Sequence, residues 1–405
     1  MEEAAAREGP TGGSSAAGAM TVSAAAGAES RRGVILTLAA AAYVAVPLYV
    51  APVLASAYVS ELGFSAEQPG YVTSAEMAGM GLATFPALWW LHRANWSRLA
   101  SGMLILVAAL DALSILAASP PSLCATRFLA GLAEGTVSIV CMSALRLTRN
   151  PNRSFGFWLF TQLCVGALVL AALPGLLRLA GVAGFFGAAA LAAAVLVWPV
   201  RWIHSGHHSS RNGANSAAPA SELSWAGVSG LAAVLAFYMA FSSIWTFVAE
   251  IARVDGIAPE RAGYVLSFAP VGGMLGAALA AGAATSFGKA GPLAVGTATL
   301  AAASWILGAR GSLGWYAPAA MALMLAWTFV VPQLMGGLAA VDRTGRLTVA
   351  VNVSIGAGLA AGPALGGLIL ASAGDYRTVA SVASILGAAS VVLATPMLYV
   401  SRGSR

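Results

Sequence analysis

Four ionisable side chains lie within long apolar stretches of this sequence, where an unpaired charge is unfavourable. They are Glu76, Asp111, Arg127 and Glu134. On membrane-insertion scales, a charged side chain near the bilayer centre costs at least about 2.5–3.5 kcal/mol, so such residues are usually paired or functional. Asp111 and Arg127 lie at similar depths on consecutive, antiparallel stretches, and we expect them to pair. Glu134 follows Arg127 by seven residues, so it lies deeper on nearly the same helix face.

The chemistry open to these acids is reversible protonation. A carboxylic acid withdrawn from water favours its neutral form and can take up and release a proton near neutral pH. Glu134, Asp111 and Glu76 are therefore candidates for proton coupling. Each acid also has a structural interpretation: a salt bridge between helices for Asp111, helix packing for Glu134, and a hydrogen bond to a neighbouring helix for Glu76.

The composition indicates that membrane helices must position these residues. Hydrophobic residues make up 59% of the chain and charged residues only 9%, and the mean hydropathy is +0.81. The apolar residues fall into runs of roughly 18–25, which is about the length that a helix needs to cross the hydrocarbon of a bilayer. We count twelve such runs, including one at 69–91 and two consecutive ones at 155–177 and 182–203. The sequence therefore predicts an all-α membrane protein with twelve transmembrane helices.

A repeated segment indicates that the chain consists of two similar halves. The segment GFSAEQPGYV at 63–72 returns as GIAPERAGYV at 256–265, each time before a long apolar run. Five of the ten positions are identical. Chance similarity between helices rich in Ala and Gly is the alternative for shorter matches elsewhere. The longer match predicts two pseudo-symmetric six-helix halves with the same orientation.

The polar stretches set the boundaries that we predict for these halves. The first stretch is rich in Ala, Gly and Ser without apolar periodicity, which is typical of a disordered tail. A second polar stretch lies midway along the chain and is predicted to be a linker. We predict a cytoplasmic N-terminal tail at 1–32, a first half at 33–203, a cytoplasmic linker at 204–224, a second half at 225–401 and a cytoplasmic C-terminal tail at 402–405.

The basic residues predict the orientation. The net charge is +6, but the Lys and Arg residues lie in short loops beside apolar runs, a pattern of membrane topology and not of nucleic-acid binding. With the N-terminus inside, about fifteen basic residues fall on the cytoplasmic side and about five on the outside. This excess predicts a multi-pass protein of the cytoplasmic membrane with both termini in the cytoplasm.

The sequence lacks the motifs of the common enzyme classes that we considered. It has no Gly-Lys-Ser/Thr phosphate loop and no nucleophile elbow, so we predict neither an enzyme nor a bound cofactor. His204, His207 and His208 lie in the predicted linker without a carboxylate or thiolate at metal-binding spacing, so we predict no metal site. Any energy input would then come from an ion gradient, for which the proton gradient is our hypothesis.

Two motifs resemble those of the major facilitator superfamily. RFLAGLAEG at 127–135 is similar to its motif B, with Gly131 and Gly135 four residues apart on one helix face that permits close helix contact. GLAAGPALGG at 358–367 is similar to motif C, although it lies on the eleventh run and not on the fifth. The loop at 91–98 occupies the place of motif A but lacks the Asp expected there.

The resemblance implies the superfamily fold and a central cavity lined by the inner helices. Aromatic and amide residues on these helices are our candidates for solute contact, together with Arg127. They are Tyr43, Tyr49, Gln162, Phe241, Trp245, Trp327, Gln333 and Asn352.

The function that the resemblance implies is secondary active transport. We expect a small amphipathic or anionic organic solute, proton coupling, and rocker-switch motion of two halves around a site at mid-membrane. The expected partners are the solute, protons and the lipid bilayer, and we expect a monomer that does not bind nucleic acid. The alternative is a membrane protein of the same fold that does not transport and acts as a solute sensor or an assembly partner.

Overall fold

The computed structural model describes residues 31–91, 93–117, 119–203, 224–286, 290–309, 313–342 and 346–403. Of the predicted tails (1–32 and 402–405) and the predicted linker (204–224), residues 1–30, 204–223 with the three histidines, and 404–405 lie outside the described residues. Residues 31–32 and 402–403 belong to helices, and Ser224 caps the helix that follows the linker. The tail and linker assignments therefore remain predictions.

The described part of the chain contains helices and no strand. Residues 31–43 form the first helical segment. The following elements are α2 (Val46–Glu61), α3 (Gln68–Leu82), α4 (Thr84–Trp90), α5 (Trp96–Ser114), α6 (Pro120–Arg146), α7 (Pro151–Val197), a short 3-10 helix η1 (Pro199–Trp202), α8 (Trp225–Val254), α9 (Pro259–Ser286), α10 (Ala290–Gly308), α11 (Leu313–Val341), α12 (Arg346–Ala373) and α13 (Tyr376–Gly403).

The predicted twelve crossings are accounted for by these helices. Ten described helical stretches are long and apolar enough to cross a membrane. One of them contains α7, which covers two predicted runs because Gly181, with φ 63°, interrupts its helical geometry. The run at 69–91 forms α3 and α4, which are separated at Ala83 and are individually too short to cross. The all-α fold with twelve crossings is therefore confirmed.

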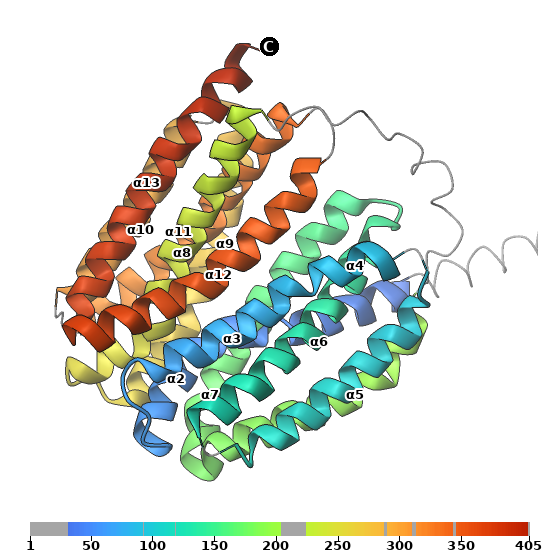
Figure 1. Ribbon diagram of the computed structural model, residues 1–405, viewed down its shortest axis with the longest axis vertical. Helices are drawn as coiled ribbons and strands as arrows, with labels where there is room; N and C mark the ends of the chain where they lie inside the picture. Colours follow the sequence, from blue (N-terminus) through green and yellow to red (C-terminus); the bar gives the residue numbers. More distant parts are fainter. Residues whose placement is uncertain are drawn as a thin grey trace, which may run out of the picture.

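The helices pack as two groups, and three helix pairs make the main contacts between them. In the first group α3 packs on α6, and α5 packs on both α6 and α7; in the second, α8 packs on α12 and α13, and α9 packs on α11. The groups meet where α3 lies against α12, α7 against α9, and α2 against α8. Figure 1 shows α3 and α12 side by side along this boundary, between the blue-to-green and the yellow-to-red helices.

The first crossing is broken near its middle. The helical segment 31–43 and α2 are separated by a turn at 44–45. Pro47 follows this turn, and Pro52 lies inside α2. Because proline lacks a backbone N–H, Pro52 leaves the carbonyl group of Leu48, four residues earlier, without its usual helical donor. This crossing therefore has two short helical parts, and the Leu48 carbonyl group in the second part is available to a donor from another element.

Candidate functional site

Glycines bring α3 and α6 together closely enough for their charged side chains to meet. A Cβ atom at Gly131 would overlap the backbone of Glu76, and one at Gly135 would lie 2.5 Å from the carbonyl oxygen of Met80. Gly79 on α3 is packed equally tightly against α6. Only glycine permits backbones to approach in this way. The predicted role of Gly131 and Gly135 in close helix contact is confirmed.

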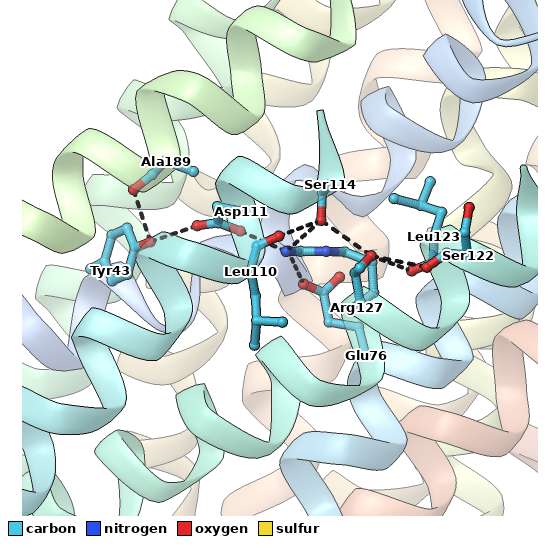
Figure 2. Close-up of polar contacts among 10 residues, drawn as sticks. Tyr43, Glu76, Leu110, Asp111, Ser114, Ser122, Leu123, Arg127 and Ala189 are labelled. Atoms are coloured by element: carbon cyan, nitrogen blue, oxygen red, sulfur yellow. Dashed lines mark hydrogen bonds and ion pairs between the residues drawn. The ribbon is translucent and has the colours of Figure 1, made fainter. Parts of the chain in front are cut away.

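This contact places Arg127 between acids from two other helices (Figure 2). Its Nη2 atom donates to Asp111 Oδ1 at 2.7 Å and to Ser114 Oγ at 3.1 Å, both on α5. Its Nη1 atom donates to Glu76 Oε1 on α3 at 3.1 Å. The guanidinium group also lies over the Phe186 ring, 4.9 Å from the ring centroid. The structure thus contains the expected Asp111–Arg127 pair and adds Glu76 to it.

Tyr43 connects this cluster to the first crossing. Its hydroxyl group is 3.2 Å from Asp111 Oδ2 and 3.0 Å from the carbonyl oxygen of Ala189 on α7, as Figure 2 shows. We predicted Tyr43 as a residue that contacts solute. In the structure its hydroxyl group hydrogen-bonds Asp111 and the Ala189 carbonyl group, and contact with solute stays a prediction. We call Tyr43, Glu76, Asp111, Arg127 and Glu134 the acidic cluster.

Glu134 lines a small cavity inside the acidic cluster. The cavity has room of about 20 Å³ for the centre of a water-sized sphere. Glu134 is 3% exposed, and its Oε2 atom has no hydrogen-bond partner among the residues that the structure describes. The cavity is lined by Tyr43, Val46, Pro47, Leu54, Tyr58, Glu76, Asp111, Arg127, Glu134, Phe185, Phe186 and Ala189. All of these residues belong to the first half, so the three candidates for proton coupling lie together in one half.

A second group of predicted residues meets at the boundary between the halves. The Phe241 ring is stacked on Trp245, at 6.0 Å between centroids and 11° between planes, and on Trp327, at 5.1 Å and 14°. Tyr49 contacts the edge of Trp327 at 6.4 Å. Tyr49 comes from α2, Phe241 and Trp245 from α8, and Trp327 from α11. We call these four residues the aromatic cluster.

A hydrogen bond joins the aromatic cluster to the break in the first crossing. Trp245 Nε1 donates to the carbonyl oxygen of Leu48 at 2.8 Å. This is the carbonyl group that Pro52 leaves without a helical donor. The bond therefore uses an acceptor that an unbroken helix would not offer to another element.

In the described part of the structure, the remaining predicted residues have no hydrogen bond or ring contact with either cluster. Gln162 donates through Nε2 to the carbonyl oxygen of Ala41 at 3.2 Å. Gln333 is buried on α11, whereas Asn352 is exposed on α12. The sequence predicted one cavity for all of these residues. The structure instead separates charged from aromatic residues, because each acid is positioned by helices of the first half.

One polar contact between the halves was not predicted. Glu250 on α8 is 2% exposed and accepts a hydrogen bond from Ser56 Oγ on α2 at 2.9 Å. Arg253 binds the same carboxylate from the next helical turn, with Nε 2.9 Å from each oxygen. An acid and an arginine three residues apart at the end of an apolar run are the signal that the sequence offers for this contact.

Among the described residues, no group of three or more His, Cys, Asp or Glu is arranged to hold a metal ion. Two acids of the acidic cluster, Glu76 and Asp111, instead pair with the guanidinium group of Arg127, and Glu134 lines the cavity beside them.

Comparisons with known proteins show similarity in fold and not in sequence. No family model and no curated protein matches the sequence. The nucleoside transporter NupG matches with a TM-score of 0.67 and 14% identity, over 91% of this chain and 99% of its own. The POT family transporter PepTSo matches with a TM-score of 0.69 and 12% identity, over 92% of this chain and 98% of its own.

The third match is a bacterial homologue of the human lysosomal transporter Spinster, in an inward-facing and unoccupied conformation. It gives a TM-score of 0.66 and 16% identity, over 92% of this chain and 97% of its own. Such low identities carry information on the fold alone. The matches extend over nearly the whole of each chain, so the likeness concerns the complete helix bundle and not one half of it.

Proposed function

We propose, from the premise that this chain has the fold of the major facilitator superfamily, that it is a secondary transporter for a small organic solute. The solved structures that it resembles are described as transporters, which supports transport over enzymatic catalysis. Their names point to different substrates or to none, so no solute is carried over from them. In this proposal the two halves move against each other and expose a site between them to each side in turn.

The acidic cluster supports coupling to protons. Two carboxyl groups bind the Arg127 guanidinium group, and the third, that of Glu134, lines the same cavity, so the cluster would carry a net charge of −2 if all four groups were ionised. Uncompensated charge in a protein interior is unfavourable, and protonation of an acid is the usual response. Glu134 is the acid whose Oε2 lacks a protein partner among the described residues. This single observation carries the proposal, with Glu134 as the proton-binding residue.

The aromatic cluster supports an amphipathic solute and not an anionic one. In this structure the rings of the aromatic cluster pack on one another, and Tyr49, Phe241 and Trp245 are at most 1% exposed. In this proposal, movement of the halves apart exposes their flat apolar faces, which suits a solute that stacks on aromatic groups. An anionic solute would need a free cation. Both terminal nitrogens of Arg127 are already bound to carboxylates, so Arg127 has little capacity left for an anion.

The membrane setting follows from the same proposal. The distribution of basic residues supports a location in the cytoplasmic membrane with both termini in the cytoplasm. In this orientation the Ser56–Glu250 contact lies near the outer surface, where it would help to hold the halves together. We propose that the chain works as a monomer, with the proton gradient as its energy source.

The test measures the external pH of energised inverted vesicles that contain the protein. Planar aromatic compounds, organic acids and cationic compounds are added in turn to weakly buffered vesicles. We expect a solute-dependent proton flux with at least one aromatic compound, and loss of that flux in Glu134→Gln. Glu260→Gln, the same substitution at an exposed acid in the first turn of α9, is the matched control and should retain the flux.

A proton flux that survives in Glu134→Gln would refute the role of Glu134. Binding of a compound without any flux would favour the alternative, a sensor of the same fold. Binding is measured in a separate experiment, by the quenching of tryptophan fluorescence, because two tryptophans belong to the aromatic cluster.

A further inference from the structure

Two residues that line the cavity inside the acidic cluster each carry a buried polar atom that needs a partner. Arg127 Nε and Glu134 Oε2 have no hydrogen-bond partner among the described residues. Both residues are 3% exposed and both line the cavity. Leaving a buried polar group unpaired costs about 1–3 kcal/mol, and more when the group is charged. A ligand that satisfies both atoms would remove this cost.

The size of the cavity restricts the ligand. A buried water needs at least about 10–15 Å³ of such space and two to four polar partners. The cavity offers about 20 Å³, so one water fits and an organic solute does not. The lining residues include Arg127, whose Nε is an unpaired donor, Glu134, whose Oε2 is an unpaired acceptor, and Tyr58.

We propose that this cavity is a binding site for one ordered water, which accepts a hydrogen bond from Arg127 Nε and donates one to Glu134 Oε2. The water joins Glu134 to the hydrogen-bonded network of Arg127, Glu76 and Asp111. This inference rests on the proposed function in one respect: the water also carries protons to Glu134. It gives one proton to the Glu134 carboxylate and takes one from the protonated carboxyl group of Glu76 or Asp111, so it ends as neutral water.

The charged and titratable residues that line the cavity come from five helical elements. Glu76 comes from α3, Asp111 from α5, Arg127 and Glu134 from α6, Tyr58 from α2, and Tyr43 from the first helical segment. Removing the water without changing these groups would therefore isolate its contribution.

Ala189 provides such a change. It lies one helical turn after Phe185 on the same face of α7, and both residues line the cavity. Ala189→Val adds two methyl groups to that wall and is expected to displace the water. Ala188→Val, at the neighbouring exposed position, is the matched control. Val46→Ile fills the cavity from the first crossing and is a second, independent variant.

The first readout is a high-resolution structure and does not depend on transport. We expect a density peak within hydrogen-bond distance of Arg127 Nε and Glu134 Oε2 in the native protein and in Ala188→Val, and no such peak in Ala189→Val. A native structure with no peak, in which Glu134 binds another protein group, would overturn the site. A peak in a protein that moves no solute would support the water site while the proposed function fails.

The second readout is the rate of proton uptake in the vesicle assay. We expect Ala189→Val and Val46→Ile to slow it by at least about tenfold, because positioned proton transfer contributes at least this much. The thermal midpoint of each variant and its tryptophan quenching by the solute show whether folding and binding are intact. Unchanged proton uptake in a folded variant that lacks the density peak would overturn the proton path.

Discussion

At the scale of single residues, the two carboxyl groups that hold Arg127 decide which roles remain open to it. The side chains of Arg127 and Asp111 are 4% and 2% exposed, so their 2.7 Å contact is shielded from water. Removing one partner of a buried ion pair typically costs about 3–5 kcal/mol, whereas replacing both with apolar residues is often close to neutral. Arg127, Asp111 and Glu76 should therefore behave as one energetic unit.

We predict that Arg127→Met lowers the free energy of unfolding by about 3 kcal/mol. Asp111→Leu alone should be similarly damaging, because it leaves part of the charge of Arg127 uncompensated. The double variant should lose clearly less than the sum of the two. Thermal unfolding in detergent checks this, with Arg153→Met at an exposed position as the control that changes stability by less than about 0.5 kcal/mol.

Additive losses of unfolding free energy from Arg127→Met and Asp111→Leu would contradict the prediction that Arg127, Asp111 and Glu76 act as one energetic unit. They would mean that Glu76 alone can hold the guanidinium group, or that the pair contributes nothing specific to the folded protein.

At the scale of elements, the broken first crossing contacts both clusters within a few residues. Tyr43 binds Asp111 before the turn at 44–45, and the carbonyl group of Leu48 binds Trp245 of the other half after it. The acceptor exists because Pro52 cannot donate to Leu48. A proline in α2 thus produces a hydrogen bond between the two halves.

We predict that Trp245→Phe destabilises the protein by about 1–3 kcal/mol, because it leaves the Leu48 carbonyl group buried and unpaired. Pro52→Ala returns an N–H group to the position that can pair with Leu48 within the helix. In that background Trp245→Phe should cost clearly less. Thermal midpoints of the four proteins test this prediction, and Trp305→Phe, at a side chain that is 57% exposed, is the control.

An equal loss in both backgrounds would show that the Trp245 ring, and not its N–H group, stabilises the contact. The stacked arrangement on Phe241 would then be the relevant interaction.

At the scale of the whole molecule, the halves are held together by a line of small residues along α3 and α12. A Cβ atom at Gly81 would lie 3.0 Å from Gly356 Cα, and Ser74 Oγ donates to the carbonyl oxygen of Ala360 at 2.6 Å. Gly70 fits equally closely against α12, 2.5 Å from the carbonyl oxygen of Pro363. These contacts require the two helices to touch through their backbones.

We predict that Gly81→Val separates α3 from α12 and favours a conformation in which the halves are apart along this line. Cross-linking between cysteines placed at Ser74 and Ala360 measures the contact, and its yield should fall severalfold. Gly102→Val on α5 is the control, because a Cβ atom there meets nothing within 4 Å. An unchanged yield with Gly81→Val would mean that the helices adjust without separating.

The sequence predicted the fold well because the fold depends on averages over many residues. Apolar runs, a repeated segment and spaced glycines each identify helices or their contacts without any tertiary information. The Asp111–Arg127 pair could also be predicted, since depth along neighbouring crossings is readable from the sequence. The position of Glu76 beside Arg127 could not, because it depends on which faces of α3 and α6 meet.

The contacts of the aromatic and amide residues were the least predictable. Tyr43 and Tyr49 are six residues apart on one crossing, yet they contact different clusters because the turn at 44–45 lies between them. The Ser56–Glu250 contact joins residues 194 positions apart, and no local pattern in either helix indicates it.

The unequal placement of the two clusters also has an evolutionary consequence. The repeat that relates the halves places Ala269, which is fully buried, where the first half has Glu76. The acidic cluster is built from the first copy alone, whereas three of the four aromatic rings come from the second. On the proposed function, substitutions in α8 and α11 can change which molecule is recognised and leave the source of energy untouched. Duplication would thus have freed one copy to diversify while the other stayed under constraint.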